Sequence, residues 1–245
     1  MKRKTLLLLG AKSDIGLAIA HRFASEGFDI QLAGRNSKIL NEECLNISVR
    51  HRVKCTFHEL DILNYQSHQK FLNSLPKLPS IALSAIGYLD NQIESENDIK
   101  ETIKTIRTNF EGLVLIFNII ANKFAHRGYG TLIGISSVAG DRGRSSNYLY
   151  GSSKAGFTTY LSGLRNKLYN SNVNVITIKP GYVRTKMTSH LKLPSMLTTD
   201  PKTVANFIYS AYKKKKNIVY ITNIWKYIMK LIIILPEGIF KKLKF

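Results

Sequence analysis

The chain has 245 residues, of which 44% are hydrophobic and 21% are charged, a composition that excludes intrinsic disorder and suits one large α/β domain. Lysine and arginine total 36 against 16 acidic residues, and the net charge of +20 attracts anionic lipid headgroups, phosphorylated substrates or nucleic acid. The sequence contains no zinc finger, no basic recognition helix and no basic stretch interleaved with aromatic residues, which argues against a nucleic-acid partner.

The two cysteines, Cys44 and Cys55, form neither a disulfide framework nor a Cys-x-x-Cys pair, which fits a reducing, cytoplasmic compartment. The six histidines are scattered, without the spacing of metal ligands. The sequence therefore predicts no metal site.

The N-terminus imitates a signal peptide, because the basic residues 2–4 precede an apolar run. The run is short, however, and leads into a turn with glycines instead of a small-residue cleavage site. It predicts a buried first strand, Thr5 to Leu9, followed by a helix from about Asp14 to Glu26 that Gly27 ends.

The turn between this strand and this helix carries a glycine at each end. Such a turn aims backbone N–H groups and the positive helix end at one point, where a pyrophosphate can bind, although a purely structural turn has the same pattern. Asp14 opposes phosphate there unless it caps the helix or turns away from the ligand. The residues expected to contact the phosphates are Gly10, Lys12, Ser13, Asp14, Ile15 and Gly16.

The second predicted strand, Phe28 to Ala33, ends in Gly34-Arg35-Asn36 and has no carboxylate at that end. A carboxylate there would accept a hydrogen bond from the 2′-hydroxyl of an unphosphorylated adenosine ribose. Arg35, together with Lys12, offers positive charge to a 2′-phosphate, so the sequence favours NADP(H) over NAD(H). The alternative is that Arg35 is only a solvated surface charge.

Strands and helices continue to alternate, which predicts a parallel sheet that binds its ligands at the carboxyl ends of the strands. The expected segments are a helix over 37–46, strands over 53–57 and 81–85, helices over 98–107 and 109–124, and strands over 130–135, 173–178 and 218–221.

The stretch from Ser136 to Lys154 carries the clearest chemistry. Tyr150 and Lys154 are four residues apart, so they share one face of a helix that runs to about Tyr169. A tyrosine keeps its proton up to a pKa of about 10, and a neighbouring cation lowers that pKa. Ser137 can bring a hydroxyl to the same point. The alternative is a surface Tyr and Lys on an ordinary helix.

The spacing of Ser137, Tyr150 and Lys154 resembles the catalytic centre of the short-chain dehydrogenase/reductase family. The resemblance runs from about Lys4 to Ile221 and implies a Rossmann-like doubly wound parallel sheet in one domain, 1–222. The residues that follow, 223–245, are expected to form an amphipathic tail. Five other segments carry the resemblance: the Gly10–Gly16 turn, Asp61-Ile62, Ser84-Ala85-Ile86-Gly87, Thr108-Asn109-Phe110-Glu111-Gly112, and Pro180-Gly181-Tyr182-Val183-Arg184-Thr185. Two of them depart from the family pattern. Asp14 stands where the middle glycine of the first turn is usual, and Ser84-Ala85-Ile86-Gly87 stands in place of Asn-Asn-Ala-Gly.

This resemblance implies an oxidoreductase that moves a hydride between NADP(H) and a ketone or alcohol. It implies that Tyr150 protonates the alkoxide, that Lys154 lowers the pKa of the tyrosine and holds the nicotinamide ribose, and that Ser137 donates to the substrate oxygen. It also implies that Asn109 kinks its helix and holds a water of the proton relay, although from the residues alone Asn109 is a helix cap.

The resemblance further assigns residues to the cofactor and implies a homodimer or homotetramer. Asp61, which could equally cap the next helix, would lie with Ile62 beside the adenine. Small residues at the fourth strand end suit a backbone close to the nicotinamide ribose. The remaining residues expected at the nicotinamide are Ala85, Gly87, Pro180, Gly181, Val183 and Thr185.

The C-terminal part is apolar and basic. Residues 185–197 suit a mobile loop that closes over substrate. The apolar run 224–235 is about half the length that spans a bilayer. Lys226 and Lys230 share one helical face of this run, which suits a helix lying on an anionic membrane as a peripheral contact. The alternative is a tail packed in a dimer interface or over the substrate pocket.

The tail and the segment Gly181 to Thr188 also look like the reductases that act on decaprenylphosphoryl keto-pentose in cell-envelope biosynthesis. A keto-sugar on a polyprenyl phosphate would account for the apolar loop, the basic excess and the tail together. The alternatives are a reductase of another small or lipid ketone, and a cofactor-binding regulatory or scaffold protein without turnover. The intact Ser137, Tyr150 and Lys154 argue against the last.

Overall fold

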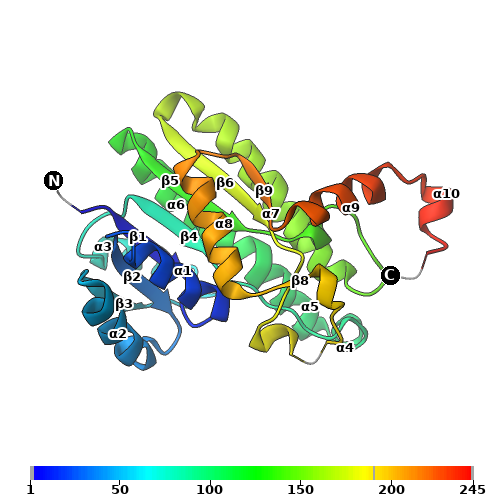
Figure 1. The fold of residues 1–245 in the computed structure, drawn as a ribbon, viewed down its shortest axis with the longest axis horizontal. Coiled ribbons are helices and arrows are strands. Elements are labelled where there is room, and N and C mark those ends of the chain that lie inside the picture. Colours follow the sequence, from blue (N-terminus) through cyan, green and yellow to red (C-terminus); the bar gives the residue numbers. More distant parts are fainter. Residues whose placement is uncertain (1–2, 190, 244–245) are drawn as a thin grey trace.

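A seven-stranded parallel sheet forms the centre of the part of the chain that the computed structural model describes, residues 3–189 and 191–243 (Figure 1). The strand order is β3-β2-β1-β4-β5-β6-β9, and the direction of winding reverses between β1 and β4. This arrangement confirms the expected Rossmann-like, doubly wound α/β fold. The strands are β1 Thr5–Leu9, β2 Asp29–Gly34, β3 Cys55–Glu59, β4 Ile81–Ser84, β5 Gly130–Ile135, β6 Val173–Lys179 and β9 Ile218–Tyr220.

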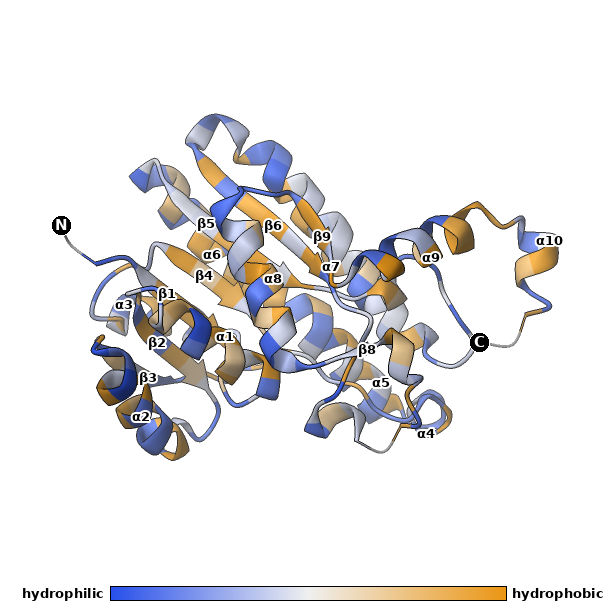
Figure 2. Ribbon diagram, viewed as in Figure 1, coloured by the Kyte–Doolittle hydropathy of each residue, from blue (hydrophilic) through white to orange (hydrophobic). Residues whose placement is uncertain are grey.

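The leucines of β1 show why its residues form a central strand. All five residues of β1 are buried, because helices cover both faces of the sheet (Figure 2). Leu6 and Leu8 point into one core cluster, and Leu7 and Leu9 point into the other. The first cluster is closed by α1 Asp14–Ala24, α2 Asn41–His51 and α8 Pro201–Lys213, and the second by α3 Ser67–Ser74, α6 Gly112–Arg127 and α7 Tyr148–Lys167.

Several helices differ from the expected ranges. The segment expected as one helix over 37–46 begins as a 3₁₀ turn, Ser37–Leu40, and then continues as α2 to His51. The helices expected over 98–107 and 109–124 are α5 Ile99–Ile106 and α6, and the π-helical segment Arg107–Glu111 joins them without a break. The helices α3, α8 and α4 Gln92–Asn97 have no counterpart among the expected helices.

The C-terminal segment is helical and packs against the domain. The helices α9 Asn223–Ile234 and α10 Glu237–Phe240 form a third, small core in which Trp225, Met229 and Ile232 contact Val138. This core lies at the carboxyl end of the sheet (Figure 1). Within the described ranges, no helix is both long and apolar enough to cross a membrane.

Candidate active site

A cavity of about 350 Å³ lies at the carboxyl ends of β1, β4, β5 and β6. The loops that follow these four strands line it, as expected for a doubly wound sheet at its point of reversal. The expected site residues that line it are Lys12, Ser13, Asp14, Ile15, Ala85, Gly87, Ser137, Tyr150, Lys154, Pro180, Gly181, Val183 and Thr185.

Tyr150 and Lys154 lie one turn apart on α7 and face the same point. The Lys154 Nζ lies 5.6 Å from the centre of the Tyr150 ring and donates a hydrogen bond of 3.2 Å to the carbonyl oxygen of Ile135. Lys154 is only 2% exposed. Ser137 lies two residues after the end of β5, and its Oγ accepts a hydrogen bond of 3.1 Å from the N–H of Ala139, which fixes the hydroxyl at the start of a 3₁₀ turn.

Burial sets the proton affinities of these two groups. It raises the pKa of Tyr150 to about 12, against the smaller lowering effect of a hydrogen bond with the Ser137 side chain. It lowers the pKa of Lys154 to about 8. The net shift of the Tyr150 pKa is therefore upward, opposite in direction to the expected lowering, because desolvation outweighs the hydrogen bond with Ser137. At neutral pH the phenol is protonated and the ammonium is charged.

Asn109 lies behind the cavity, in the π-helical segment, and not at a helix end as a cap. Its Oδ1 accepts a hydrogen bond of 3.0 Å from the N–H of Tyr88, and its Nδ2 donates to the carbonyl oxygens of Tyr88 and Thr105 at 2.7 and 2.9 Å. A Cβ atom built on Gly87 would lie 3.6 Å from Asn109 Oδ1 and 3.7 Å from Lys154 Nζ. The amide of Asn109 and the ammonium of Lys154 therefore both lie close to Gly87, in the loop that follows β4.

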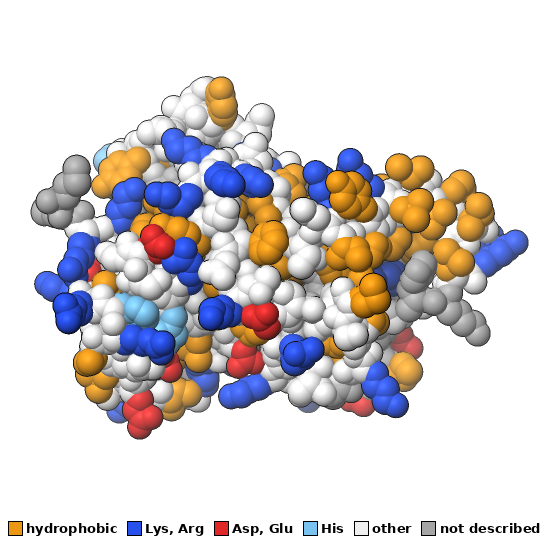
Figure 3. Space-filling view, viewed as in Figure 1, with side chains coloured by type: hydrophobic (Ala, Val, Ile, Leu, Met, Phe, Trp, Pro, Cys, Tyr) orange, Lys and Arg blue, Asp and Glu red, His pale blue; other side chains and the backbone are white. Residues whose placement is uncertain are grey.

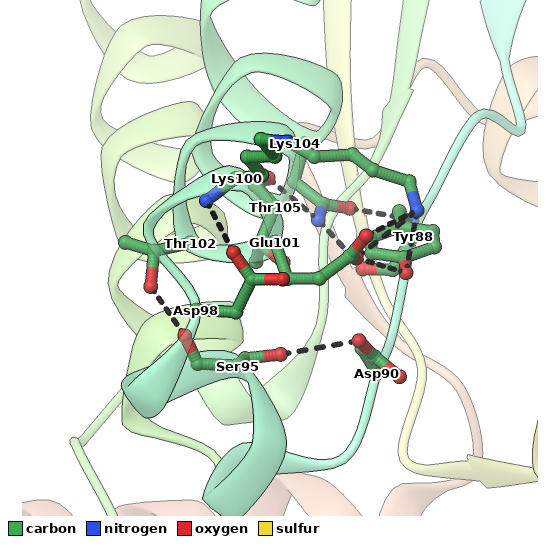
Figure 4. A network of polar contacts seen from close by, with 10 residues as sticks. Tyr88, Asp90, Ser95, Asp98, Lys100, Glu101, Thr102, Lys104 and Thr105 are labelled. Carbon is green, nitrogen blue, oxygen red and sulfur yellow. Dashed lines mark hydrogen bonds and ion pairs between the residues drawn. The ribbon is translucent and has the colours of Figure 1, made fainter.

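A polar network fixes the loop after β4 to α5 (Figure 4). The Tyr88 hydroxyl donates to Glu101 at 2.5 Å and accepts from Lys104 at 2.8 Å, and the ammonium of Lys104 also contacts both oxygens of Glu101 at 3.0 Å. Burial, and then the bond to Glu101, raises the pKa of Tyr88. These contacts hold Gly87 in place from outside the cavity.

The first turn is too tight for side chains at its glycines. Gly10 has φ +83°, and a Cβ there would lie 2.8 Å from the N atom of Ile86. A Cβ on Gly16 would lie 2.7 Å from the carbonyl oxygen of Gly10. Both glycines therefore lie outside the lining of the cavity and allow its backbone to close. Ser13 caps α1, accepting from the N–H of Gly16 at 3.0 Å.

Asp14 turns toward the loop after β6. Its carboxylate accepts a hydrogen bond of 2.7 Å from the N–H of Lys186, so it joins the first turn to the segment that follows Thr185. Ser13 and not Asp14 caps the helix, so the first of the two alternatives for Asp14 is wrong.

The end of β2 lies beside a carboxylate that the sequence pattern did not reveal. Glu59, at the end of β3, pairs in register with Gly34 and accepts hydrogen bonds from the N–H groups of Asn36 and Ser37 at 2.8 and 2.7 Å. These bonds, that of Ser37 above all, lower the pKa of Glu59, and the charge of Lys12 adds to the effect. Arg35 is exposed beside this carboxylate and does not line the cavity.

Asp61 and Ile62 also lie outside the lining of the cavity. The Asp61 Oδ1 accepts from the N–H of Leu63 at 3.0 Å, which closes a local turn, and α3 begins only at Ser67. Ile62 belongs to the second core cluster, and its carbonyl oxygen would lie 2.6 Å from a Cβ on Gly112. The side chain of Ile62 is therefore packed in the core beneath the cavity edge.

The outer wall of the cavity comes from the C-terminal helix. The Trp225 Nε1 donates to the carbonyl oxygen of Leu197 at 3.0 Å, and its ring packs edge-on against Tyr182 with 5.3 Å between centroids. A Cβ on Gly181 would lie 2.0 Å from the indole, so only glycine admits this ring. The other apolar residues of this wall are Leu89, Val138, Met187 and Leu191.

The turn that follows Ser137 is tied to the C-terminal helix. The guanidinium of Arg142 donates to the carbonyl oxygens of Ile232 at 2.8 Å and of Leu235, and pairs with Glu237 at 2.7 Å. The carboxylate of its neighbour, Asp141, pairs with Lys179 and accepts from the Tyr220 hydroxyl at 2.7 Å. Two charged residues thus connect the serine turn to α9, β6 and β9.

Sequence reasoning missed Arg144 and Asn147, which line the cavity between Ser137 and Tyr150. Their position in the sequence between two candidate catalytic residues is the only feature that could have indicated them. Trp225 carried no signal of its own, because its contacts join segments far apart in the sequence. In residues 3–189 and 191–243, no group of three or more His, Cys, Asp or Glu residues could hold a metal ion.

Comparisons with known proteins agree with this geometry. Residues 4–194 match the family model described as short chain dehydrogenase. An uncharacterized oxidoreductase of Streptomyces coelicolor is 30% identical over 243 residues, which cover 98% of this chain and 96% of the relative. An uncharacterized oxidoreductase of Mycobacterium tuberculosis is 30% identical over 219 residues, 88% of this chain and 87% of the relative. Among solved structures, a short-chain dehydrogenase from Sphingobium yanoikuyae in complex with NADPH has a TM-score of 0.80 at 18% identity and covers 98% of this chain and 96% of its own.

Proposed function

The chain belongs to the short-chain dehydrogenase/reductase family and is an NAD(P)-dependent oxidoreductase acting on CH–OH groups, and from that premise we propose that it reduces a ketone with NADPH. The observation that carries the proposal is the convergence of Ser137, Tyr150 and Lys154 on one cavity at the carboxyl ends of the strands. The phenol of Tyr150 is half-buried and protonated at neutral pH, so it can act as the proton donor.

Four residues have proposed catalytic roles. The cofactor supplies a hydride to the carbonyl carbon of the substrate when it is bound. Tyr150 gives its proton to the carbonyl oxygen, and Ser137 donates a hydrogen bond to the same oxygen. Lys154 holds a positive charge beside the phenol and binds the nicotinamide ribose, and Asn109 holds the water through which the proton is replaced.

The residues present fit a dinucleotide along this cavity. The tight first turn and the N-terminus of α1 suit the pyrophosphate, and the small residues after β4 leave room for the nicotinamide ribose. The positive charges of Lys12 and Arg35 suit a 2′-phosphate. The full set proposed for the cofactor is Gly10, Lys12, Ser13, Asp14, Ile15, Gly16, Arg35, Asp61, Ile62, Ala85, Gly87, Tyr150, Lys154, Pro180, Gly181, Val183 and Thr185.

Consumption of NADPH with a panel of ketones of increasing size tests this function. We expect turnover with at least one ketone and none without ketone. A regulatory or scaffold protein would bind NADPH with the same affinity and consume none with any member of the panel. The intact proton donor and its buried lysine favour the enzyme.

NADPH is expected to have a Michaelis constant about tenfold below that of NADH, because one charged hydrogen bond to a phosphate is worth about 1.5–3 kcal/mol. Arg35→Ala should raise the constant for NADPH and leave that for NADH unchanged. Steady-state kinetics with both cofactors measures this, and Arg50→Ala, on the surface of α2, is the matched control. Equal constants for the two cofactors would contradict the preference.

The pH dependence of ketone reduction is expected to follow Lys154. Its lowered pKa of about 8 means that the free enzyme has a charged ammonium below pH 8 and a neutral amine above it, while Tyr150, with a pKa of about 12, keeps its proton throughout. The kcat/KM for NADPH, which reports groups of the free enzyme, should be level below about pH 8 and fall above it. A plateau that continues unchanged to pH 10 would contradict this.

The substrate that we propose is an amphiphilic ketone, and the specific candidate is a keto-sugar on a polyprenyl phosphate used in cell-envelope biosynthesis. The apolar outer wall of the cavity and the net charge of +20 support it. A reductase of another small or lipid ketone is the alternative. Activity with short synthetic prenyl-phosphate keto-sugars, against the same sugars without the lipid, would separate the two.

We propose that the catalytic domain, 1–222, is cytoplasmic and that the tail, 223–245, rests on the anionic inner face of the cytoplasmic membrane. The buried face of α9 is formed by Trp225, Met229 and Ile232, whereas the opposite face exposes Tyr227, Leu231 and Ile234. Figure 3 shows apolar side chains gathered where α9 and α10 lie, with Lys and Arg side chains beside them. Apolar groups flanked by lysines suit an anionic interface.

Replacing the exposed apolar side chains by acids is expected to abolish binding to vesicles that contain anionic lipid. The double variant Leu231→Glu, Ile234→Glu changes side chains that are 67% and 78% exposed, so the fold and the turnover of a soluble ketone should persist. Flotation measures binding, and Val49→Glu, at a 79% exposed site on α2, is the control. Equal flotation of the double variant and the wild type would contradict the membrane contact.

We also propose a homodimer or homotetramer. The helix α5 exposes Ile99, Ile103 and Ile106, spaced to form one apolar stripe on its surface. This stripe supports an interface between copies of the chain, because contiguous exposed apolar surface marks sites of association.

A further inference from the structure

Arg144 brings a guanidinium to the cavity, and the proposed catalytic steps do not use it. Its Nε atom is buried and has no hydrogen-bond partner within the described part of the chain. The nearby Arg142, by contrast, uses its guanidinium on carbonyl oxygens and a carboxylate. A buried donor without a partner is costly, so such groups are retained where a ligand completes them.

Asn147 presents a second polar group to the same cavity. It precedes α7 directly, at the position where an asparagine side chain usually caps the helix, yet its side chain makes no capping bond. Its Oδ1 is buried and, among residues 3–189 and 191–243, has no partner. Arg144 and Asn147 belong to the loop that precedes Tyr150, whereas the residues proposed for the cofactor phosphates belong to the first turn.

The charges around the cavity favour a negative ligand. Its lining includes the cations Lys12, Arg144, Lys154 and Lys186 and one acid, Asp14, whose carboxylate is held by the N–H of Lys186. The nearby carboxylates are also engaged, since Glu96 accepts from the Tyr148 hydroxyl at 2.6 Å and Asp141 pairs with Lys179. A guanidinium with free donors binds carboxylate, phosphate or sulfonate groups, often with two parallel hydrogen bonds.

We infer that Arg144 binds an anionic group carried by the substrate, so that the enzyme takes ketones with an acidic substituent. That the bound molecule is a substrate rests on the proposed ketone reductase function. The binding of the anion itself does not depend on turnover. The apolar wall formed by Trp225, Met187 and Leu191 would then hold the rest of the molecule.

Trp225 makes the inference measurable. It is the only tryptophan of the 245-residue sequence and it lines the cavity, so its fluorescence reports ligands bound there. Hexyl phosphate and hexan-1-ol differ only in the anion. Each is titrated into the full-length protein with saturating NADP⁺, which occupies the cofactor phosphate sites, and inorganic phosphate is titrated alongside.

In the wild type we expect hexyl phosphate to bind about 10- to 100-fold more tightly than hexan-1-ol, the ratio that one charged hydrogen-bonded contact supplies. Arg144→Gln should remove that advantage and leave hexan-1-ol unchanged, and Arg144→Lys should keep part of it. Arg184→Gln is the matched control, because Arg184 is exposed and does not line the cavity.

Three results would overturn the inference: equal affinities of the wild type for the two hexyl compounds, unchanged affinity in Arg144→Gln, or an equal loss in Arg184→Gln. Binding of hexyl phosphate only when NADP⁺ is left out would place the anion at the cofactor site and would also overturn it. Because the readout is binding, an anion site with no ketone turnover would refute the proposed function and leave the anion site established. Melting curves of each variant confirm that it is folded.

Discussion

Tyr150→Phe is expected to bind NADPH almost as the wild type does and to lose ketone reduction by a factor of about 10² to 10⁴, the usual contribution of a positioned general acid. The change removes one hydroxyl and keeps the ring that packs beside Lys154. Because burial holds the pKa of Tyr150 at about 12, the wild-type phenol is protonated at pH 7 and is the proton donor that the variant lacks.

The measurements are the single-turnover rate of NADPH oxidation and the dissociation constant from NADPH fluorescence. Tyr148→Phe is the matched control, because Tyr148 lies on the same helix but donates its hydroxyl to Glu96, at 2.6 Å, and is 40% exposed. Its rate should stay within about twofold of the wild type, as for most surface substitutions. Retained activity in Tyr150→Phe would remove this residue from the mechanism.

Lys154→Met is expected to be inactive and, at pH 7, more stable than the wild type. Burial lowers the pKa of Lys154 from 10.5 to about 8, so the folded state prefers the neutral amine. Below pH 8 both the folded and the unfolded chain bind the proton, and the folded chain carries a constant cost of about 3 kcal/mol, at 1.36 kcal/mol per unit of pKa. Between pH 8 and 10.5 the folded chain loses the proton first, and its stability rises with pH.

Methionine has no charge to desolvate, so the free energy of unfolding of the Lys154→Met variant at pH 7 should exceed that of the wild type. The gain should be about 1 to 3 kcal/mol, less than the full cost because the carbonyl of Ile135 loses its partner. The gain should shrink above pH 10. Denaturant melts at pH 7 and pH 10 measure it, with Lys167→Met, at the exposed end of α7, as control. A Lys154→Met variant that is less stable than the wild type at pH 7 would contradict the proposed cost of burying the charged Lys154.

The strands of the sheet could be predicted because helices cover both of its faces. Segments such as Leu6 to Leu9 are apolar at every position, and their length and flanking turns then define them. The start of α2 could not be predicted, because the four residues 37–40 suit a 3₁₀ turn as well as an α-helix. The π-helical segment had no pattern either, since it differs from an α-helix only in which backbone groups pair.

The site was predictable where one motif lies at one strand end, and unpredictable where two distant segments meet. Glu59 approaches the end of β2 from the neighbouring strand, and Trp225 reaches Gly181 from the tail, so neither contact has a local signature. The direction of the Tyr150 pKa shift was not predictable for a different reason. Sequence spacing shows that a lysine is near, but it does not show how much water the fold removes from both groups.

The contact of Trp225 with Gly181 has a consequence for the order in which the protein forms. Every strand of the sheet precedes Trp225 in the sequence, so the ribosome releases the whole sheet before the indole that closes the cavity. Because a domain generally folds as a unit, a nascent chain that has emerged only as far as β9 is expected to lack the outer wall of the cavity. Only when α9 emerges can Arg142 bind its carbonyl groups, and the serine turn and the cavity wall are then secured in the same step.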